Sequence, residues 1–438
     1  MRNLFAVLAG ISLLLYGLFP GDTQSSHAFL FLGSSLLALV VVARIHRKIA
    51  AIAILHLIKE HPDIHPADLW EYIYNQISIW PIRGPVVVRR VDYPVLDLRQ
   101  PDRPLPNGRL MLMRCFIDTA CIASLTIQLF KRMDETVSLE VFDSLARLWS
   151  SRCAQHLRLR LEVSGYESLK LVTHQSIIVL NHESLLDFAL GFYGVGGAGT
   201  GRGNRLRPRF IAAKDHFKDN FFLHSVIGMG RAMDQAGMIF VDRKTKGAGR
   251  KVISESVAAM RKSGVDLAIF PQGTRASAHF DANEKPTGAG FYTTTRAPVA
   301  GVGHFKPGTA RIAAELSQYQ EVDIVLVAIL GTATAIPAKR FDVYPGATIS
   351  YHIAPPITVK AEEQTDAVEL NQRIELAVRK NARVHPRLLT AWQEQSTGKN
   401  GDLDALTSAL QAWDEAADPV PFATLDVILS HPAHERPA

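Results

Sequence analysis

The segment from Asn181 to Asp187 carries the residue types of an acid–base site. Its sequence, Asn-His-Glu-Ser-Leu-Leu-Asp, places His182 and Asp187 five residues apart, directly after an apolar run at 176–180 that is typical of a buried strand. If a helix begins near His182, Asp187 lies little more than one turn later, where its carboxylate can orient the imidazole. An imidazole held in this way can remove a proton from an alcohol. A histidine in a buried polar contact, or a helix start capped by Asn181, would give the same pattern without catalysis.

A second group of residues is suited to binding an anion. The run from Phe270 to Arg275 offers backbone N–H groups, a hydroxyl and a guanidinium, and the run from Gly237 to Arg243 ends in Asp-Arg. An arginine can hold two phosphate oxygens at once, and a glycine lets the backbone approach them closely. We therefore predict an anion cradle in the segment 270–275, with Gly273, Thr274 and Arg275, and a further guanidinium that can bind phosphate oxygens at Arg243. Each arginine taken alone is more often a surface charge.

The sequence around these residues lacks the usual metal and dinucleotide motifs. The run that starts at His182 has Leu186 where a helical zinc motif needs its second histidine. The glycine-rich run 194–199 leads into arginines rather than into a helix, and no Gly-x-Ser-x-Gly elbow occurs. We expect no metal and no cofactor. The cysteines, which are too few and too irregular for a disulfide framework, are Cys115, Cys121 and Cys153.

Alternating strand and helix patterns predict the scaffold of these residues. Apolar runs typical of strands lie at 176–180, 209–213, 237–241, 265–270, 323–329 and 347–353, and the clearest helical patterns lie at 249–262 and 308–318. This alternation predicts an α/β fold with a mixed, largely parallel sheet flanked by helices. Both candidate sites follow strand ends, where open sheets of this class carry their functional residues.

The first fifty residues have the pattern of a membrane anchor. Two apolar runs, 4–19 and 28–43, are joined by a short turn, and basic residues flank them at Arg2 and from Arg44 onward. The runs are a little shorter than the ~20 residues that span a bilayer. We predict a transmembrane helical hairpin with both ends and the catalytic domain on the cytosolic side. A cleaved signal peptide and a pair of buried helices are the alternatives. The net charge of +6 suits an anionic surface.

In order and spacing, four segments resemble the motifs of the glycerolipid acyltransferase family, whose type member acylates 1-acyl-glycerol-3-phosphate. In chain order, the four matching segments are Asn181–Asp187, Gly237–Arg243, Phe270–Arg275 and the run 323–329, which has Leu326 where proline is usual. Phe305-Lys306-Pro307-Gly308 resembles a further segment of the family. The regions expected on this basis are a membrane hairpin and its extension (1–58), a connector with helices (59–136), an acyltransferase domain (137–360) and a helical C-terminal extension (361–438).

The resemblance implies a membrane-bound O-acyltransferase that needs no cofactor. His182 would be the base and Asp187 its orienting partner, and the acceptor hydroxyl would attack the thioester of acyl-CoA or acyl-carrier protein without an acyl-enzyme. Arg243, Gly273, Thr274 and Arg275 would hold the phosphate of a lysophospholipid. The favoured acceptor is 1-acyl-glycerol-3-phosphate, whose acylation gives phosphatidic acid. The supporting residues implied are Asn181, Ser184 and Gln272. Partners would be membrane lipids and the acyl donor. Nucleic acid is not expected, since the arginines lack interleaved aromatic residues.

Departures from the family pattern leave the acceptor open. Gln272 stands where glutamate is usual, Ala276 stands where serine is usual, and a long insertion separates Thr274 from Phe305. Glycerol-3-phosphate or another lysolipid would fit as acceptor. Gln272 also leaves room for a catalytically silent lipid-binding relative, although the intact acid–base pair opposes that reading. A basic loop contains Arg202, Arg205, Arg207 and Arg209. Additional headgroup or carrier contacts are one hypothesis for this loop, and a solvated loop without such contacts is the alternative.

Overall fold

The computed structural model describes residues 49–64, 69, 88–90, 104–195, 199–203, 205–243, 245, 247–273, 275, 277–278, 292–293, 305–336, 342–344, 347–361 and 365–381. The chain divides into two compact units. The larger unit comprises Pro85–Met113, Ser150–Ile211 and Gly249–Ala438, and the smaller comprises Met1–Gly84, Arg114–Trp149 and Ala212–Ala248. The predicted hairpin and Thr274 lie outside the described residues. The four expected regions stay predictions.

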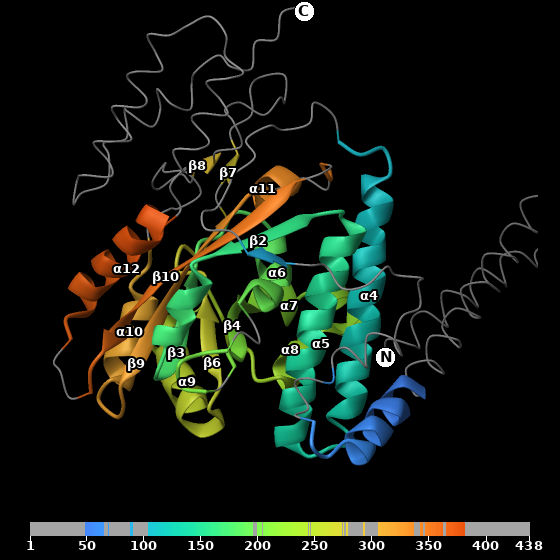
Figure 1. The fold of residues 1–438 in the computed structure, drawn as a ribbon, viewed down its shortest axis with the longest axis horizontal. Coiled ribbons are helices and arrows are strands. Elements are labelled where there is room, and N and C mark those ends of the chain that lie inside the picture. Colours follow the sequence, from blue (N-terminus) through green and yellow to red (C-terminus); the bar gives the residue numbers. More distant parts are fainter. Residues whose placement is uncertain are drawn as a thin grey trace, which may run out of the picture. The chain divides into compact units, whose positions relative to one another are not determined.

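Eight strands form one mixed sheet in the order β1-β2-β10-β9-β3-β6-β4-β5, and Figure 1 labels most of them. The strands are β1 (Val88–Arg90), β2 (Arg160–Ser164), β3 (Gln175–Leu180), β4 (Pro208–Ala213), β5 (Ile239–Val241), β6 (Asp266–Ile269), β9 (Val322–Leu330) and β10 (Thr348–Val359). From β1 to β4 in this order, every pairing is parallel except that of β9 with β10. The predicted mixed, largely parallel α/β sheet is confirmed. A separate antiparallel pair joins β7 (Ser277–Ala278) to β8 (Tyr292–Thr293).

Strands β9, β3 and β6 lie side by side and parallel at the centre of this sheet. β9 is buried along its whole length, and β3 is buried at every position after its first. Near-continuous apolar runs of this kind are typical of parallel strands that are covered on both faces. Because the three strands are parallel, their carboxyl ends meet at one edge of the sheet.

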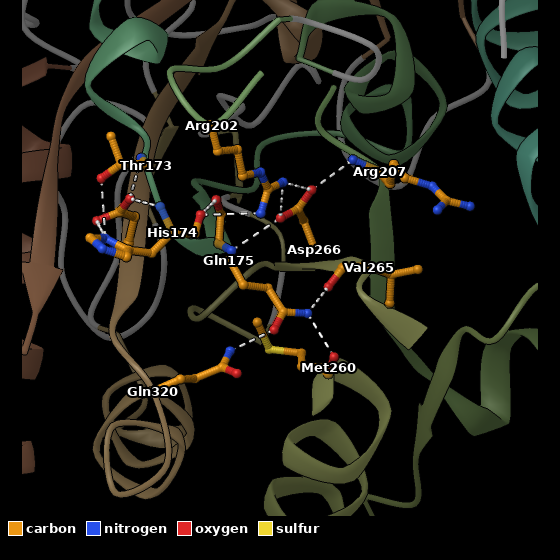
Figure 2. A network of polar contacts seen from close by, with 11 residues as sticks. Thr173, His174, Gln175, Arg202, Arg207, Met260, Val265, Asp266 and Gln320 are labelled. Carbon is orange, nitrogen blue, oxygen red and sulfur yellow. Dashed lines mark hydrogen bonds and ion pairs between the residues drawn. The ribbon is translucent and has the colours of Figure 1, made fainter. Parts of the chain in front are cut away.

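A polar network holds the opposite edge, where the same strands begin (Figure 2). Asp266 is fully buried at the start of β6, and Arg202 Nη2 lies 2.7 Å from both of its carboxylate oxygens. Asp266 also accepts the backbone N–H groups of Ser176 at 3.0 Å and Arg207 at 2.8 Å. Arg202 therefore has a structural role at the edge away from His182. Arg209 is buried in β4, so for these two arginines the headgroup prediction is wrong.

Helices of the larger unit follow or precede the central strands. They are α6 (Leu186–Gly194) after β3, α9 (Ala248–Ser263) before β6, α10 (Gly308–Leu316) before β9, α11 (Thr332–Ala335) after β9, α12 (Ala367–Asn381) and the 3-10 helix η2 (Tyr166–Leu171). The helical patterns predicted at 249–262 and 308–318 are confirmed by α9 and α10. α12 contacts α10, β9 and β10. Helix α6 lies close to β10 because Gly194 has no side chain, and a Cβ there would meet the Tyr351 ring.

The smaller unit is mainly helical. It contains a helix at 49–60, most of α4 (Gly108–Leu129) and α5 (Glu135–His156), α7 (Lys214–Phe217), a π-helix η3 (Phe222–Ile227), α8 (Met229–Gln235) and β5. Trp149 Nε1 donates to Thr119 Oγ1 at 2.8 Å and so links α5 to α4. Among the described helices, α4 is long and apolar enough to cross a membrane, but 56% of its apolar window is buried inside the protein. A buried core helix has the same composition, so α4 is weak evidence for membrane association.

The polar network in Figure 2 predicts a large loss of stability when Asp266 is removed. Asp266→Ala leaves the half-buried Arg202 guanidinium and two backbone N–H groups without their acceptor. Breaking a buried ion pair in this way costs roughly 3–5 kcal/mol. Urea unfolding of the purified protein measures the loss. The control is Lys251→Ala, which removes an exposed i,i+4 pair with Glu255 and should cost less than about 0.5 kcal/mol. Equal losses in the two variants would contradict the structural role of Asp266.

Candidate active site

Three parallel strands deliver the side chains of the candidate site. His182 follows the end of β3, Gln272 follows the end of β6, and Thr332 follows the end of β9. Asn181 joins two of these ends, because its side-chain Nδ2 donates to the carbonyl of Ile329 at 2.8 Å and its Oδ1 accepts the N–H of Ile329 at 2.6 Å. The amide thereby continues the β3–β9 pairing by one residue beyond the strand. This explains why a buried asparagine precedes the histidine.

His182 and Asp187 form the predicted pair. His182 Nδ1 lies 2.8 Å from Asp187 Oδ2, and the Asp187 side chain is fully buried while that of His182 is 19% exposed. With the Nδ1 proton donated to the carboxylate, the Nε2 lone pair is the one that can accept a proton. The His182 ring also stacks on Phe270, with centroids 4.4 Å apart. The imidazole is therefore held on two sides, with one nitrogen left for a substrate.

The short connection from β3 to α6 keeps Asp187 in place. The backbone N–H groups of Glu183 and Ser184 donate to Asp187 Oδ2 at 2.6 and 2.8 Å. Ser184 Oγ donates to the carbonyl of Ile336 at 2.9 Å and so ties the turn to the segment after α11. Buried backbone N–H groups need such partners, and a carboxylate is a strong acceptor for them. The five-residue spacing therefore lets Asp187 bind the backbone N–H groups of the turn as well as the His182 ring.

Gln272 binds the backbone of His182. Its Oε1 accepts the N–H of His182 at 2.9 Å, and its side chain is buried. Because a backbone N–H can only donate, this contact fixes which end of the amide is the oxygen. Gln272 Nε2 is buried and has no hydrogen-bond partner among the described residues. The amide thus keeps the contact that a glutamate would make to His182 and turns a donor, instead of a second anionic oxygen, toward its other neighbours.

The predicted anion cradle is described in part. Gly273 has φ +69°, a backbone conformation that favours glycine, and a Cβ added to it would lie 2.7 Å from Lys306 Nζ. The N–H of Lys306 donates to the carbonyl of Pro271 at 2.9 Å, which fixes this lysine to the turn after β6. Arg275 is half-buried two residues beyond Gly273. The structure therefore brings Gly273 next to Gln272 and adds a lysine ammonium beside it.

Arg243 belongs to the smaller unit and has partners there. Its Nη2 lies 3.0 and 2.9 Å from the two carboxylate oxygens of Asp215, and 3.1 Å from His216 Nε2. Burial raises the pKa of Asp215, but the hydrogen bond and charge of Arg243, with His216, outweigh burial and lower it. In the structure this guanidinium already has an anionic partner. Its assignment to a substrate phosphate stays a prediction.

Sequence reasoning missed three residues of this site: Lys306, Thr332 and Tyr351. Thr332 Oγ1 donates to Asp187 Oδ1, on the side of the carboxylate away from His182. Tyr351 is fully buried, its OH donates to the carbonyl of Leu190 at 3.1 Å, and burial first and the Asp187 charge second raise its pKa well above the usual range. The sequence gives only weak signals for two of them. Gly331-Thr332 ends a long apolar run, and Lys306 belongs to a segment that resembles one of the family. Among the described residues, no three metal-ligating side chains lie together.

Comparison with known proteins agrees with the geometry. Residues 160–330 match the family model described as Acyltransferase, a range that includes His182, Asp187 and Gln272. No curated protein matches the chain. Among solved structures, the crystal structure of the 1-acyl-sn-glycerophosphate (LPA) acyltransferase PlsC from Thermotoga maritima is similar at 19% sequence identity and a TM-score of 0.42, covering 63% of this chain and 96% of that one. A likeness at this level does not bear on the substrate. The match to the family model over residues 160–330 agrees with the resemblance seen in the motifs and supports an enzyme that transfers acyl groups.

Proposed function

We propose that this protein is a membrane-bound O-acyltransferase that acylates a lysophospholipid, with 1-acyl-glycerol-3-phosphate as its preferred acceptor and phosphatidic acid as its product. The observation that carries the proposal is the His182–Asp187 hydrogen bond at the carboxyl edge of the acyltransferase domain. A buried carboxylate on Nδ1 leaves Nε2 as the base, and the partly exposed ring makes that base accessible. A purely structural histidine has no need of this exposure.

The geometry supports direct acyl transfer. The acceptor hydroxyl gives its proton to His182 Nε2 while its oxygen forms a bond to the carbonyl carbon of the thioester. The tetrahedral intermediate then collapses, the C–S bond breaks, and the leaving thiolate takes the proton back from the imidazolium. Asp187 stabilises the imidazolium between these two steps, as the carboxylate does in hydrolytic triads. The described site residues include no serine or cysteine hydrogen-bonded to His182, so no side chain here is poised to hold the acyl group. Acyl-CoA and acyl-carrier protein both supply the thioester that this chemistry needs.

The acceptor phosphate would bind beside the base, at the turn after β6. Gly273 brings backbone close to the phosphate, and Lys306 and Arg275 supply positive charge around it. The assignments of Thr274 and Arg243 to the same phosphate stay predictions from the sequence. The neutral Gln272 removes the repulsion that a carboxylate would have for this phosphate, and its Nε2 can donate to an oxygen. These features favour a phosphate-bearing acceptor over an uncharged lysolipid.

The acceptor and product are both membrane lipids, which fits the predicted N-terminal hairpin and a catalytic domain on the cytosolic face. Membrane lipids and the acyl donor are accordingly the proposed partners.

A panel assay tests the function as a whole. Purified protein in vesicles is given labelled acyl-CoA or labelled acyl-carrier protein with 1-acyl-glycerol-3-phosphate, other lysophospholipids or glycerol-3-phosphate. We expect the highest kcat/KM with 1-acyl-glycerol-3-phosphate. Transfer to none of the acceptors would favour the catalytically silent alternative.

His182→Ala removes the proposed base. We expect kcat to fall by roughly 10²–10⁴-fold, the usual contribution of a positioned base, because the acceptor hydroxyl keeps its proton. Vesicle association should not change. The matched control is His174→Ala, which alters a histidine paired with Glu321 at the opposite edge of the sheet and should leave kcat within about twofold. An active His182→Ala variant would refute the role of this histidine.

Gln272→Glu tests the phosphate subsite. A carboxylate still accepts the His182 N–H, but it places a negative charge beside the bound phosphate. We expect KM for 1-acyl-glycerol-3-phosphate to rise about three- to tenfold, because the new carboxylate repels the acceptor phosphate and solvent and salt screen this repulsion only in part. The KM for the acyl donor should not change. Gln235→Glu is the control, because it adds the same charge at an exposed position of α8. Unchanged acceptor kinetics in Gln272→Glu would show that this residue does not face the phosphate.

A further inference from the structure

The second oxygen of the Asp187 carboxylate has its own partner. Oδ2 accepts from His182, Glu183 and Ser184, whereas Oδ1 accepts the hydroxyl of Thr332. Asp187 and Thr332 are both fully buried, so water does not replace this contact. The acidic partner of the base therefore depends on a hydroxyl that comes from a different strand.

The turn after β9 is built to deliver that hydroxyl. Gly331 has φ +90°, and a Cβ there would collide with the carbonyl of Thr348. The turn thus requires glycine, and it brings Thr332 onto α6 at the start of α11. Gly331 is the N-cap of α11, and Thr332 is the first residue of that helix. The hydroxyl contacts described for Thr332 are to the carboxylates of Asp187 and Glu183.

A second carboxylate competes for the same hydroxyl. Glu183 is buried, and its Oε2 lies 3.4 Å from Thr332 Oγ1, farther than the Asp187 oxygen. A hydroxyl has one proton, so it donates to one carboxylate at a time. The shorter contact assigns that proton to Asp187. Three titratable groups lie around Asp187 in the described structure. His182 binds it directly, Glu183 lies beside the same hydroxyl, and Tyr351 is buried, with burial and the Asp187 charge raising its pKa.

We propose that Thr332 is a positioning residue of the catalytic pair, which donates its hydroxyl proton to Asp187 Oδ1 and thereby sets both the orientation of the carboxylate and its hold on the imidazole proton. A donor on Oδ1 draws electron density from the carboxylate, so Oδ2 binds the Nδ1 proton of His182 less strongly. Without this donor, the pair takes up a second proton more readily, and the base is lost at a higher pH. The rate consequence rests on the acyl transfer proposed above.

Three variants test the role of the hydroxyl. Thr332→Val keeps the shape and removes the donor, and Thr332→Ser keeps the donor. Thr309→Val is the matched control, because Thr309 is also fully buried and its hydroxyl has no partner among the described residues. For Thr332→Val we expect kcat to fall about 10- to 100-fold with KM nearly unchanged. The same range is seen in metalloenzymes when a group that hydrogen-bonds to a metal-binding side chain is removed. The acidic limb of the pH–rate profile should move up by roughly one pH unit. Thr332→Ser should restore both, and Thr309→Val should change neither.

A substrate-free measurement separates this proposal from the proposed function. NMR titration of isotope-labelled histidine in the vesicle-bound protein follows the His182 ring directly, and its midpoint should rise in Thr332→Val as the acidic limb does. If wild-type protein transfers no acyl group but the midpoint still rises, the proposed function fails and the role of Thr332 stands. If Thr332→Val does not fold, Thr332→Cys, with its weak donor, should move the midpoint part of the way. An unchanged midpoint, or no rescue by serine, would overturn the proposal.

Discussion

The buried charge of Asp187 is the constraint on which the site depends. A carboxylate with no exposed surface costs several kcal/mol unless nearby donors compensate it. Here one imidazole, two backbone N–H groups and one hydroxyl do so. These bonds fix the turn from β3 to α6, and one of them orients the His182 ring. The stability of the turn and the basicity proposed for His182 therefore depend on the same set of interactions.

Strand order brings the donors together. β9, β3 and β6 are neighbours in the sheet but not in the sequence, and their parallel direction puts Thr332, His182 and Gln272 at one edge. At the other edge, Asp266 binds Arg202 and two backbone N–H groups, which holds the strands in register away from the candidate site (Figure 2). The sheet thus has a buried carboxylate at each edge: Asp266 aligns strands, and Asp187 is proposed to orient the base.

Local patterns in the sequence predicted much of this architecture. The apolar runs of β3 and β9 and the amphipathic run of α9 were visible because burial and helix periodicity leave a direct trace in residue order. His182 and Asp187 were visible because only one turn separates them. Thr332 was not, since it meets Asp187 across 145 residues and no periodicity connects them. The headgroup prediction for Arg202 was wrong for the same reason, because its partner Asp266 lies 64 residues away at the start of β6 and only the fold shows that the pair is buried.

The ionised Asp187 is proposed to make His182 a base for direct acyl transfer. The most direct test is the turnover of Asp187→Asn, which preserves the size of the side chain but removes the charge that holds Nδ1–H. The account predicts a loss of roughly 10³-fold or more in kcat, comparable to the same change in hydrolytic triads, with the circular dichroism spectrum unchanged. Turnover within tenfold of the wild-type protein would contradict it.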